Sequence, residues 1–341
     1  ASASAKPAAN PAAASAATVS GKKDVIKLGV LASASDAGFY IGLEKGWFAD
    51  LGIDIQTSQF GTAAQMVAPL SAGQLDAGGG ATSAGLNNAI ARNIGIKMVA
   101  DKGRVPADSS YQAIVIRKDI WDAGKVKDYK DLKGLKFALP GVGISPQVAV
   151  DRAMRKGGLT IKDLDVVTIN FPDMAAAFAG KSIDAAHPIE PFTTQIPSKG
   201  LGAIFHRSND YSPNGQIAVV LYSPNFIKDR VDVGKRFMVG FLRGIRLYND
   251  GFFKKPRDQQ AHDDVVAILA KSTAVKDTSL YDKMELPAIS PNADMIVQSM
   301  KDDQDWYIQH GYQKSAVDIQ GGIDMNFAQY AMQQLGGAYT A

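Results

Sequence analysis

One short unit occurs twice in this sequence, and it most constrains how the chain can fold. The first copy, Ala72–Ala77, reads AGQLDA, and the second, Ala179–Ala185, reads AGKSIDA with one inserted residue. In each copy a helical stretch precedes the glycine and a short apolar segment follows it, which is typical of a helix that stops before a strand. The copies lie roughly 110 residues apart, well above the period of solenoid repeats, so they predict two lobes built to one plan.

The duplication extends upstream of both copies. Apolar strands are predicted at Val25–Val30 and Leu135–Leu139, and second strands follow at Ile53–Gln56 and Val166–Asn170. A helical stretch and a glycine separate the two strands in each copy, which is the order of a right-handed βαβ unit. The chain is therefore predicted to be an α/β protein.

Two helix starts flank the first repeated unit. Thr62 and Ser83 each precede apolar residues at helical spacing, so both are predicted to cap helices. Leu75–Ala77 is interpreted as a short strand, and Gly78–Gly80 as a freely bending loop. Unpaired N–H groups and positive dipole ends at two helix starts suit a small anion or a polar ligand.

Composition excludes several classes of protein and site. The chain has 341 residues, 46% of them hydrophobic, which is enough for a substantial core. A net charge of +3, with both signs spread evenly, argues against a nucleic-acid-binding protein. There are no cysteines, and the four histidines are scattered singly, so no metal site and no cofactor are expected.

Residues 1–23 are rich in Ala, Ser and Pro and have almost nothing to bury, so they are predicted to be disordered. The chain does not begin with Met, and its first residues fit a mature exported protein whose signal peptide has been removed. A remnant of an expression vector is the alternative.

The segment GFYIGLEKGWFADLGIDIQ, residues 38–56, resembles periplasmic substrate-binding proteins of the nitrate, sulfonate and taurine type. SAGQLDAG, IVIRKD, DLKGLKFALPGVG, GLTIKDLDVVTI, AGKSIDAA and IEPF follow in the order of that family. The resemblance covers about residues 24–250. It implies a two-lobed clamshell of the type II periplasmic-binding-protein fold, with a ligand cleft between the lobes and two hinge crossings.

The resemblance also implies that the second lobe is inserted into the first. Lobe 1 is expected to comprise residues 24–111 plus 217–341, and lobe 2 residues 112–216. The crossings are placed near Ser110–Gln112 and near Asn214–Ala218. Helical segments after the second crossing are expected to pack back on lobe 1.

Function and partners follow from the same resemblance. It implies a monomeric periplasmic protein that captures a small molecule and delivers it to a membrane ABC permease with its ATPase. Neither an enzyme activity nor a nucleic-acid partner is expected. A small organic anion, sulfonate- or carboxylate-like, is the favoured ligand, and an aminopyrimidine or another amine-bearing molecule is the alternative.

Ligand contacts are expected in loops that end strands and start helices, where open α/β sheets bind their ligands. The candidates are Ser35, Asp36, Phe39, Phe60, Gly61, Thr62, Ala81, Thr82 and Ser83 from lobe 1, Gly143, Ile144, Ser145, Phe171, His187 and Glu190 from lobe 2, and Tyr211 beside the second crossing.

Several of these candidates have specific expected roles. Phe60 and Phe171 are expected to face one another by lobe symmetry and to enclose an apolar body. Glu190, if buried and unpaired, would tend to be neutral, and a ligand amine would then be its natural partner. Thr62, Ser83 and His187 have structural alternatives as helix caps or packed side chains.

Enzyme alternatives are weaker. ATSAG at residues 81–85 loosely resembles a nucleophile elbow, but a triple-glycine loop precedes its serine. GVGISP at residues 141–146 has proline where a dinucleotide loop needs glycine. Pyrimidine-precursor synthases of this fold have a cysteine-rich iron motif, and this chain has no cysteine.

Overall fold

The computed structural model describes residues 23–340. The predicted disorder of residues 1–23 therefore falls almost wholly outside the described residues. None of the described helices has both the length and the apolar character needed to cross a membrane.

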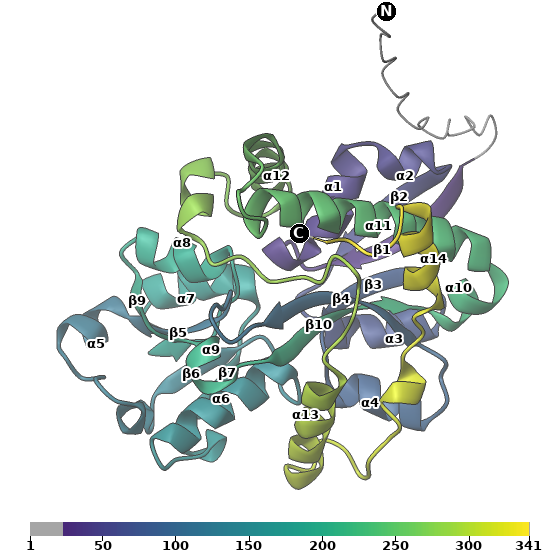
Figure 1. The fold of residues 1–341 in the computed structure, drawn as a ribbon. Helices are drawn as coiled ribbons and strands as arrows, with labels where there is room; N and C mark the ends of the chain where they lie inside the picture. Colours follow the sequence, from purple (N-terminus) through teal and green to yellow (C-terminus); the bar gives the residue numbers. More distant parts are fainter. Residues whose placement is uncertain (1–22, 341) are drawn as a thin grey trace, which may run out of the picture.

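Two five-stranded sheets form the centres of two lobes, which lie side by side in Figure 1. We call the parts packed around the two sheets lobe 1 and lobe 2. The lobe 1 sheet contains β1 (Asp24–Val30), β2 (Ile53–Gln59), β3 (Ala77–Ala81), β4 (Lys97–Val105) and β10 (Gly215–Tyr222). The lobe 2 sheet contains β5 (Ala113–Arg117), β6 (Lys136–Leu139), β7 (Asp165–Thr168), β8 (Ala185–Ala186) and β9 (Gly202–Arg207).

The two sheets share one strand order, which confirms the predicted common plan. Lobe 1 has the order β2-β1-β3-β10-β4, and lobe 2 has the order β7-β6-β8-β5-β9. In each sheet the first three strands are parallel and the fourth runs antiparallel to both of its neighbours. The chain thus crosses between the sheets after β4 and again before β10, and β10 begins within the range predicted for the second crossing.

Helices cover both faces of each sheet. Lobe 1 has α1 (Ala37–Glu44), α2 (Trp47–Asp50), α3 (Val67–Ser71), α4 (Ala84–Ala91), α10 (Pro224–Asp229), α11 (Val231–Phe252), α12 (Gln259–Ser272) and α14 (Asn326–Gln334). Lobe 2 has α5 (Lys118–Asp122), α6 (Ser145–Lys156), α7 (Met174–Ala179), α8 (Phe192–Ser198) and α9 (Ser208–Tyr211). The 3-10 turns are η1 (Ala34–Asp36), η2 (Ala63–Met66), η3 (Tyr129–Leu132), η4 (Ile161–Asp163), η5 (Phe171–Asp173), η6 (Thr278–Lys283) and η7 (Gln320–Gly322).

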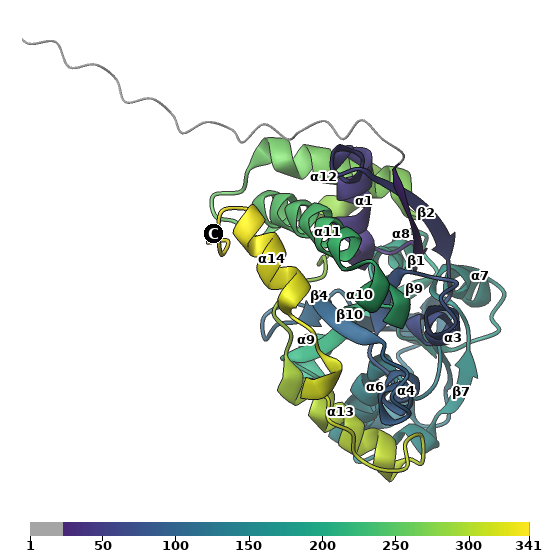
Figure 2. The same ribbon diagram turned by 90° about the vertical axis from the view of Figure 1, so that its right-hand side faces the viewer.

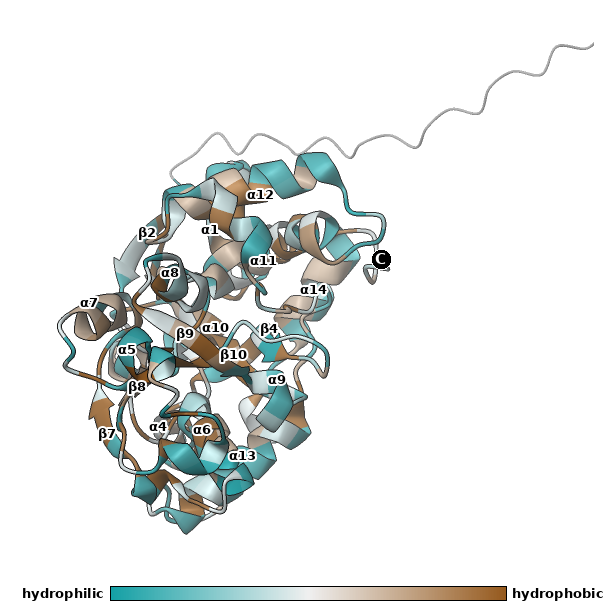
Figure 3. Cartoon of the chain, turned by 90° about the vertical axis from the view of Figure 1, so that its left-hand side faces the viewer, coloured by the Kyte–Doolittle hydropathy of each residue, from teal (hydrophilic) through white to brown (hydrophobic). Residues whose placement is uncertain are grey.

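The largest apolar core lies between the lobe 1 sheet and helices α1, α11, α12 and α14. Figure 3 shows hydrophobic residues on β10 in the interior and hydrophilic ones on the outer helix α12. Helix α11, which follows the second crossing, packs on the lobe 1 sheet, since its Phe237 and Phe241 belong to this core.

The aspartates of the repeated unit have matching structural roles in the two lobes. Asp76 Oδ2 accepts a hydrogen bond from the backbone N–H of Lys27, and its other oxygen pairs with Arg230. In lobe 2, Asp184 Oδ2 accepts from the backbone N–H of Lys136, and Arg117 binds its Oδ1. Each aspartate therefore fixes the turn before one parallel strand (β3 or β8) to the neighbouring parallel strand (β1 or β6).

Gly78–Gly80 form a buried strand rather than the loop predicted from the sequence. They lie within β3, and Leu75–Ala77, predicted as the strand, mostly precede it. The glycines are required because neighbours approach closely on both faces. A Cβ on Gly80 would lie 2.8 Å from Ala63 Cβ, and one on Gly79 would lie 2.5 Å from Lys102 Cδ.

Helix α13 (Val297–Gln309) contacts both lobes, although the sequence places its segment in lobe 1 alone. Met300 packs in the lobe 1 cluster that includes residues of α4, whereas Trp306 packs in the main lobe 2 cluster. Trp306 Nε1 also donates to Asp151 Oδ2 of α6 over 2.9 Å. Figure 2 shows α13 beside α4 and α6. The helix is thus a third link between the lobes, in addition to the two crossings.

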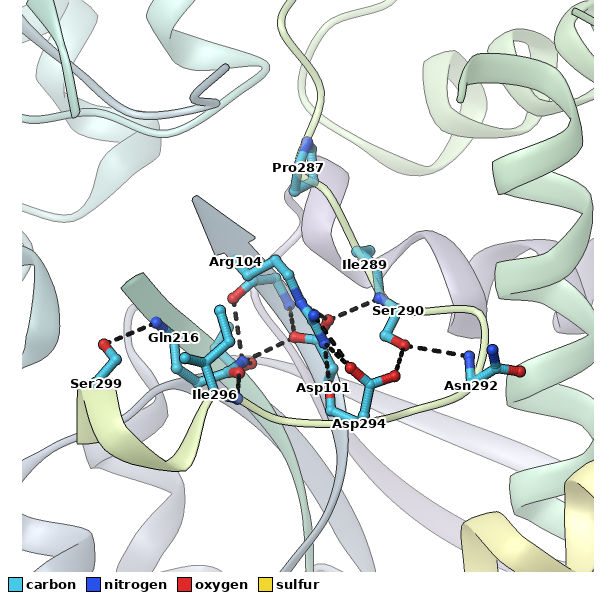
Figure 4. A network of polar contacts seen from close by, with 12 residues as sticks. Asp101, Arg104, Gln216, Pro287, Ile289, Ser290, Asn292, Asp294, Ile296 and Ser299 are labelled. Atoms are coloured by element: carbon cyan, nitrogen blue, oxygen red, sulfur yellow. Dashed lines mark hydrogen bonds and ion pairs between the residues drawn. The ribbon is translucent and has the colours of Figure 1, made fainter. Parts of the chain in front are cut away.

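A buried carboxylate, Asp101, ties the two lobe 1 strands next to the crossings to the segment before α13 (Figure 4). Its oxygens accept hydrogen bonds from Gln216 Nε2 of β10 over 2.8 Å and from the Ser290 backbone N–H over 2.7 Å. Arg104 Nε lies 2.8 Å from Asp101 Oδ2, and the same guanidinium also reaches Asp294. Arg104 is thereby committed to this network.

Substituting Gly79 tests the close approach of Lys102 to β3. We expect Gly79→Ala to lower the free energy of unfolding by about 1–3 kcal/mol, because its Cβ would meet both a side chain and a backbone oxygen. Gly85→Ala is the matched control, since its Cβ would meet only Ser83 Oγ, 3.7 Å away, beyond the backbone of its own helix, and alanine favours helices. Urea unfolding measures both. Equal effects of the two substitutions would contradict this account.

Candidate functional site

The surfaces where the two lobes meet are joined by backbone hydrogen bonds. Ser83 and Ile144 form an antiparallel bridge across the interface. The backbone N–H of Ala84 donates to Gly143 O over 2.8 Å, and that of Ser145 donates to Thr82 O over 3.0 Å. These contacts bring two predicted groups of site residues together, one following β3 and one at the start of α6.

A second lobe contact lies near the end of β1. The backbone N–H of Ala34 donates to Glu190 O over 3.3 Å. Ser35 and Asp36, both predicted site residues, are part of the same buried turn. Both sides of the lobe interface are therefore in contact, and the structure is a closed one.

Ser35 and Asp36 contact a buried lysine that was not predicted from the sequence. Lys102 Nζ lies 2.9 Å from Asp36 Oδ1 and 2.9 Å from Ser35 Oγ, and both charged side chains are 0% exposed. Asp36 Oδ2 accepts the backbone N–H groups of Leu31 and Ser33. The buried Lys102 ammonium is thus neutralised by a carboxylate that is itself fixed by the backbone.

His187 is also buried between polar partners. Its Nε2 lies 3.0 Å from both Ser208 Oγ and Tyr211 Oη. Burial lowers the pKa of His187 to about 3, so the ring is neutral at physiological pH. The predicted residues His187 and Tyr211 therefore belong to one cluster, and Ser208 is an additional member.

Glu190 is buried but not unpaired. Its carboxylate accepts the hydroxyl and the backbone N–H of Thr194, at 2.8 and 3.0 Å. Burial raises the pKa of Glu190 to about 7, although Arg207 Nη1, 3.6 Å from Oε1, opposes this rise. The side chain is thus occupied within lobe 2, and the backbone carbonyl of Glu190 makes the contact to lobe 1.

The loops after the second strands also face each other across the interface. A Cβ on Gly61 would lie 2.2 Å from Asn170 Oδ1. The loop after β6 is also close, since a Cβ on Gly141 would lie 3.8 Å from Thr62 Cγ2. Thr62 also forms a capping box with Gln65, so its structural role as a cap is present.

The phenyl rings of these loops do not form the expected pair. Phe171 stacks on Phe192 with ring centroids 6.4 Å apart, inside the lobe 2 core. Phe60 is half-buried and packs against a lobe 1 cluster that includes Leu31 and Met66. The two loops therefore lie close together, but their aromatic side chains point into separate cores.

Phe39 lies apart from the interface as well. It is fully buried against Phe237 and Phe241, with ring centroids 5.9 and 4.9 Å apart, so it belongs to the lobe 1 core. The prediction failed because α1 presents its aromatic face to α11. Ala81 is the last residue of β3 and pairs with Ala218 of β10.

Four buried polar side-chain atoms of the described residues have no partner, and they belong to Thr82 at the lobe interface, Gln112 at the first crossing and His187 in the cluster with Tyr211. They are Thr82 Oγ1, Gln112 Oε1, Gln112 Nε2 and His187 Nδ1. Buried polar groups are normally hydrogen-bonded, so each of these atoms needs an explanation. Asp36 Oδ1 and His262 Nε2 also lack hydrogen bonds but have charged neighbours, Lys102 at 2.9 Å and Asp282 at 3.0 Å.

Lys102 and Gln112 are not among the predicted site residues, although the sequence around each carries a weak signal. Lys102 follows Asp101 within an otherwise largely apolar strand, and Gln112 directly precedes the apolar run Ala113–Ile116. Polar residues at such positions are costly to bury without a purpose. Among the predicted site residues, Tyr211 lines a surface hollow of about 380 Å³, beside Arg152 and Asp302.

The comparisons with known proteins now identify the family. A model described as the NMT1-like family matches residues 20–250. The chain belongs to this family. No curated protein sequence matches the chain.

Several solved structures of binding proteins have the same fold as this NMT1-like protein. The nitrate-binding protein NrtA of Synechocystis has a TM-score of 0.75 at 15% identity, covering 92% of this chain and 89% of its own. A zinc-bound ligand-binding component of an ABC-type import system from Staphylococcus aureus has a TM-score of 0.71 at 14% identity, covering 91% and 99%. The alkanesulfonate-binding protein SsuA from Xanthomonas axonopodis pv. citri, bound to MOPS, has a TM-score of 0.69 at 15% identity, covering 89% and 99%.

These findings confirm the resemblance to the nitrate, sulfonate and taurine family and the periplasmic-binding-protein fold. Identities this low establish the fold alone. Nitrate, zinc and MOPS are ligands of those proteins.

A double substitution tests the buried ion pair of this NMT1-like protein. We expect Lys102→Met to lower the free energy of unfolding by about 3–5 kcal/mol, because it leaves Asp36 charged, buried and uncompensated. Adding Asp36→Asn should restore most of the loss, since asparagine can still accept the Leu31 and Ser33 N–H groups. Urea unfolding of the two single variants and the double variant measures the coupling. A double variant no more stable than Lys102→Met would contradict the pairing.

Proposed function

We propose that this protein is an extracytoplasmic solute-binding protein that captures a small organic molecule between its lobes and delivers it to an ABC importer. The observation that carries the proposal is the group of four unpartnered polar atoms on Thr82, Gln112 and His187. A solute held between the lobes would supply their missing partners. The family match and the structural similarity to import-system binding proteins support this function.

The proposed mechanism is a shift between open and closed states. A ligand favours the closed state when it makes more contacts there than in the open state. In the closed structure, backbone hydrogen bonds at Thr82–Ala84 and at Ala34 already link the lobes. Opening would break these bonds and expose the interface to solute, and helix α13 would have to slide or tilt on one of its two partners.

The charges of the buried side chains bear on the class of solute. The sequence favours an organic anion, and the structure offers such a ligand buried hydroxyls and Lys102. Asp36 neutralises that lysine, however, and His187 is uncharged, so these residues provide no net positive charge. An enzyme of the same fold is disfavoured because none of the unpartnered side chains is an activated nucleophile. We also propose that the protein acts as a monomer.

An engineered disulfide tests closure. The chain has no cysteine, so Ser83→Cys with Ile144→Cys introduces the only pair. The two positions oppose each other in a β-bridge, at a separation that a disulfide can span. We expect the oxidised variant to be locked closed, unable to take up added solute, and to recover uptake on reduction.

The readout is a thermal-shift screen of sulfonates, carboxylates, nitrate, taurine, amides and aminopyrimidines. A solute at about a hundred times its dissociation constant adds roughly 2.7 kcal/mol of stability. The Ser83→Cys single variant is the control for loss of the helix cap. A solute that shifts the oxidised double variant as much as the reduced one would contradict binding between the lobes.

A further inference from the structure

Gln112 stands out among the unpartnered residues because its backbone is fixed while its side chain is not. The backbone N–H of Gln112 donates to Ser110 Oγ over 3.1 Å, and the backbone carbonyl of Gln112 accepts the Ser208 N–H over 3.0 Å. Gln112 also forms an antiparallel bridge with Ile189. The residue is thus held rigidly at the first crossing, next to the strand β5.

The Gln112 side chain is fully buried, and both ends of its amide lack partners. The residue is 0% exposed, and neither Oε1 nor Nε2 makes a hydrogen bond. A primary amide has two donor positions and two acceptor positions, so its burial without partners is doubly unfavourable. Methionine has a similar size and would fill this position without that penalty. The glutamine therefore points to a partner that needs both a donor and an acceptor.

The neighbouring charges limit what that partner can be. The Lys102 ammonium is paired with Asp36, and the Arg207 guanidinium contacts Glu285 at 2.9 Å. His187, whose Nδ1 is also unpartnered, is neutral. A bare anion would offer only acceptors, so it would leave Gln112 Oε1 unpaired and would meet no uncompensated cation here.

We propose that Gln112 recognises an uncharged amide group of the solute, a carboxamide or a lactam, through paired hydrogen bonds. Gln112 Nε2 donates to the solute carbonyl, and Gln112 Oε1 accepts the solute N–H. Thr82 Oγ1 and His187 Nδ1 supply further hydrogen bonds to the polar part of the solute. This inference rests on the proposed solute-binding function and narrows its ligand class.

Matched pairs of probes test the inference on the unaltered protein. Nicotinamide is compared with nicotinate, benzamide with benzoate, and 2-pyrrolidinone with 4-aminobutyrate, each at equal concentration in the thermal-shift assay. We expect at least one amide to raise the midpoint and its charged counterpart to leave it unchanged. The inference would be overturned if an anion raised the midpoint as much as its amide counterpart, or if the anion raised it and the amide did not.

Two variants separate recognition from a structural role. We expect Gln112→Met to weaken the binding of the active amide by about tenfold or more, which one lost hydrogen-bond pair can account for. Its ligand-free midpoint should stay equal or rise, because two unpaired polar atoms are removed. Gln74→Met, at an exposed glutamine of lobe 1, is the matched control and should change neither value.

The outcomes also distinguish this inference from the proposed function. If an anion binds and the oxidised Ser83→Cys/Ile144→Cys lock blocks it, solute binding stands and the role of Gln112 is wrong. A Gln112→Met variant with a lower ligand-free midpoint and unchanged amide affinity would likewise show a structural role. If no probe of either kind shifts the midpoint, the amide assignment is overturned, and the absence of binding across the full solute screen would overturn the function too.

Discussion

The buried pair of Lys102 and Asp36 is the interaction on which the lobe interface depends. Asp36 closes the turn after β1 by accepting two backbone N–H groups, and Lys102 reaches it from β4 past Gly79. An uncompensated charge at either position would be strongly destabilising, so the pair requires a glycine in β3 and fixes the turn that meets Glu190 of lobe 2. It also leaves this part of the interface electrically neutral, which bears directly on the kind of solute that would bind there.

The connection between the lobes is more extensive than two hinge segments. Helix α13 packs Met300 against lobe 1 and Trp306 against lobe 2, and Asp303 of the same helix pairs with Arg152 of α6 over 2.8 Å. The Asp101 network anchors the segment before this helix to both strands next to the crossings. Lobe motion would therefore be coupled to α13, because the helix cannot stay fixed to both lobes while they separate.

Much of the fold could be predicted because it repeats. Each lobe needs a strand, a helix and a strand in the same order, and the matching Asp76 and Asp184 show that even the turn chemistry recurs. The triple glycine was misread because glycine is common in loops, whereas here the absence of side chains allows Met66, Ala63 and Lys102 to approach β3. Such close approach depends on distant segments, so local sequence patterns do not reveal it.

The candidate site was only partly predictable for the same reason. Thr82, Ser83, Ile144 and Ser145 follow from helix starts beside strand ends, and these residues do meet across the lobes. The prediction that Phe39 contacts the ligand failed because its ring packs on α11. That helix is about 200 residues away in sequence, and no local pattern indicates the contact. Gln112 and Lys102 were missed because their significance lies in burial and in missing or charged partners, which only the folded structure displays.

A crystal structure of the protein with a solute that passes the thermal-shift screen tests the central claim most directly. The account predicts a solute enclosed by both lobes, with polar atoms within hydrogen-bonding distance of Thr82 Oγ1, Gln112 and His187 Nδ1. It would be contradicted by a solute bound to one lobe only, or in the hollow beside Tyr211 and Arg152, with the same three side chains bonded to water instead.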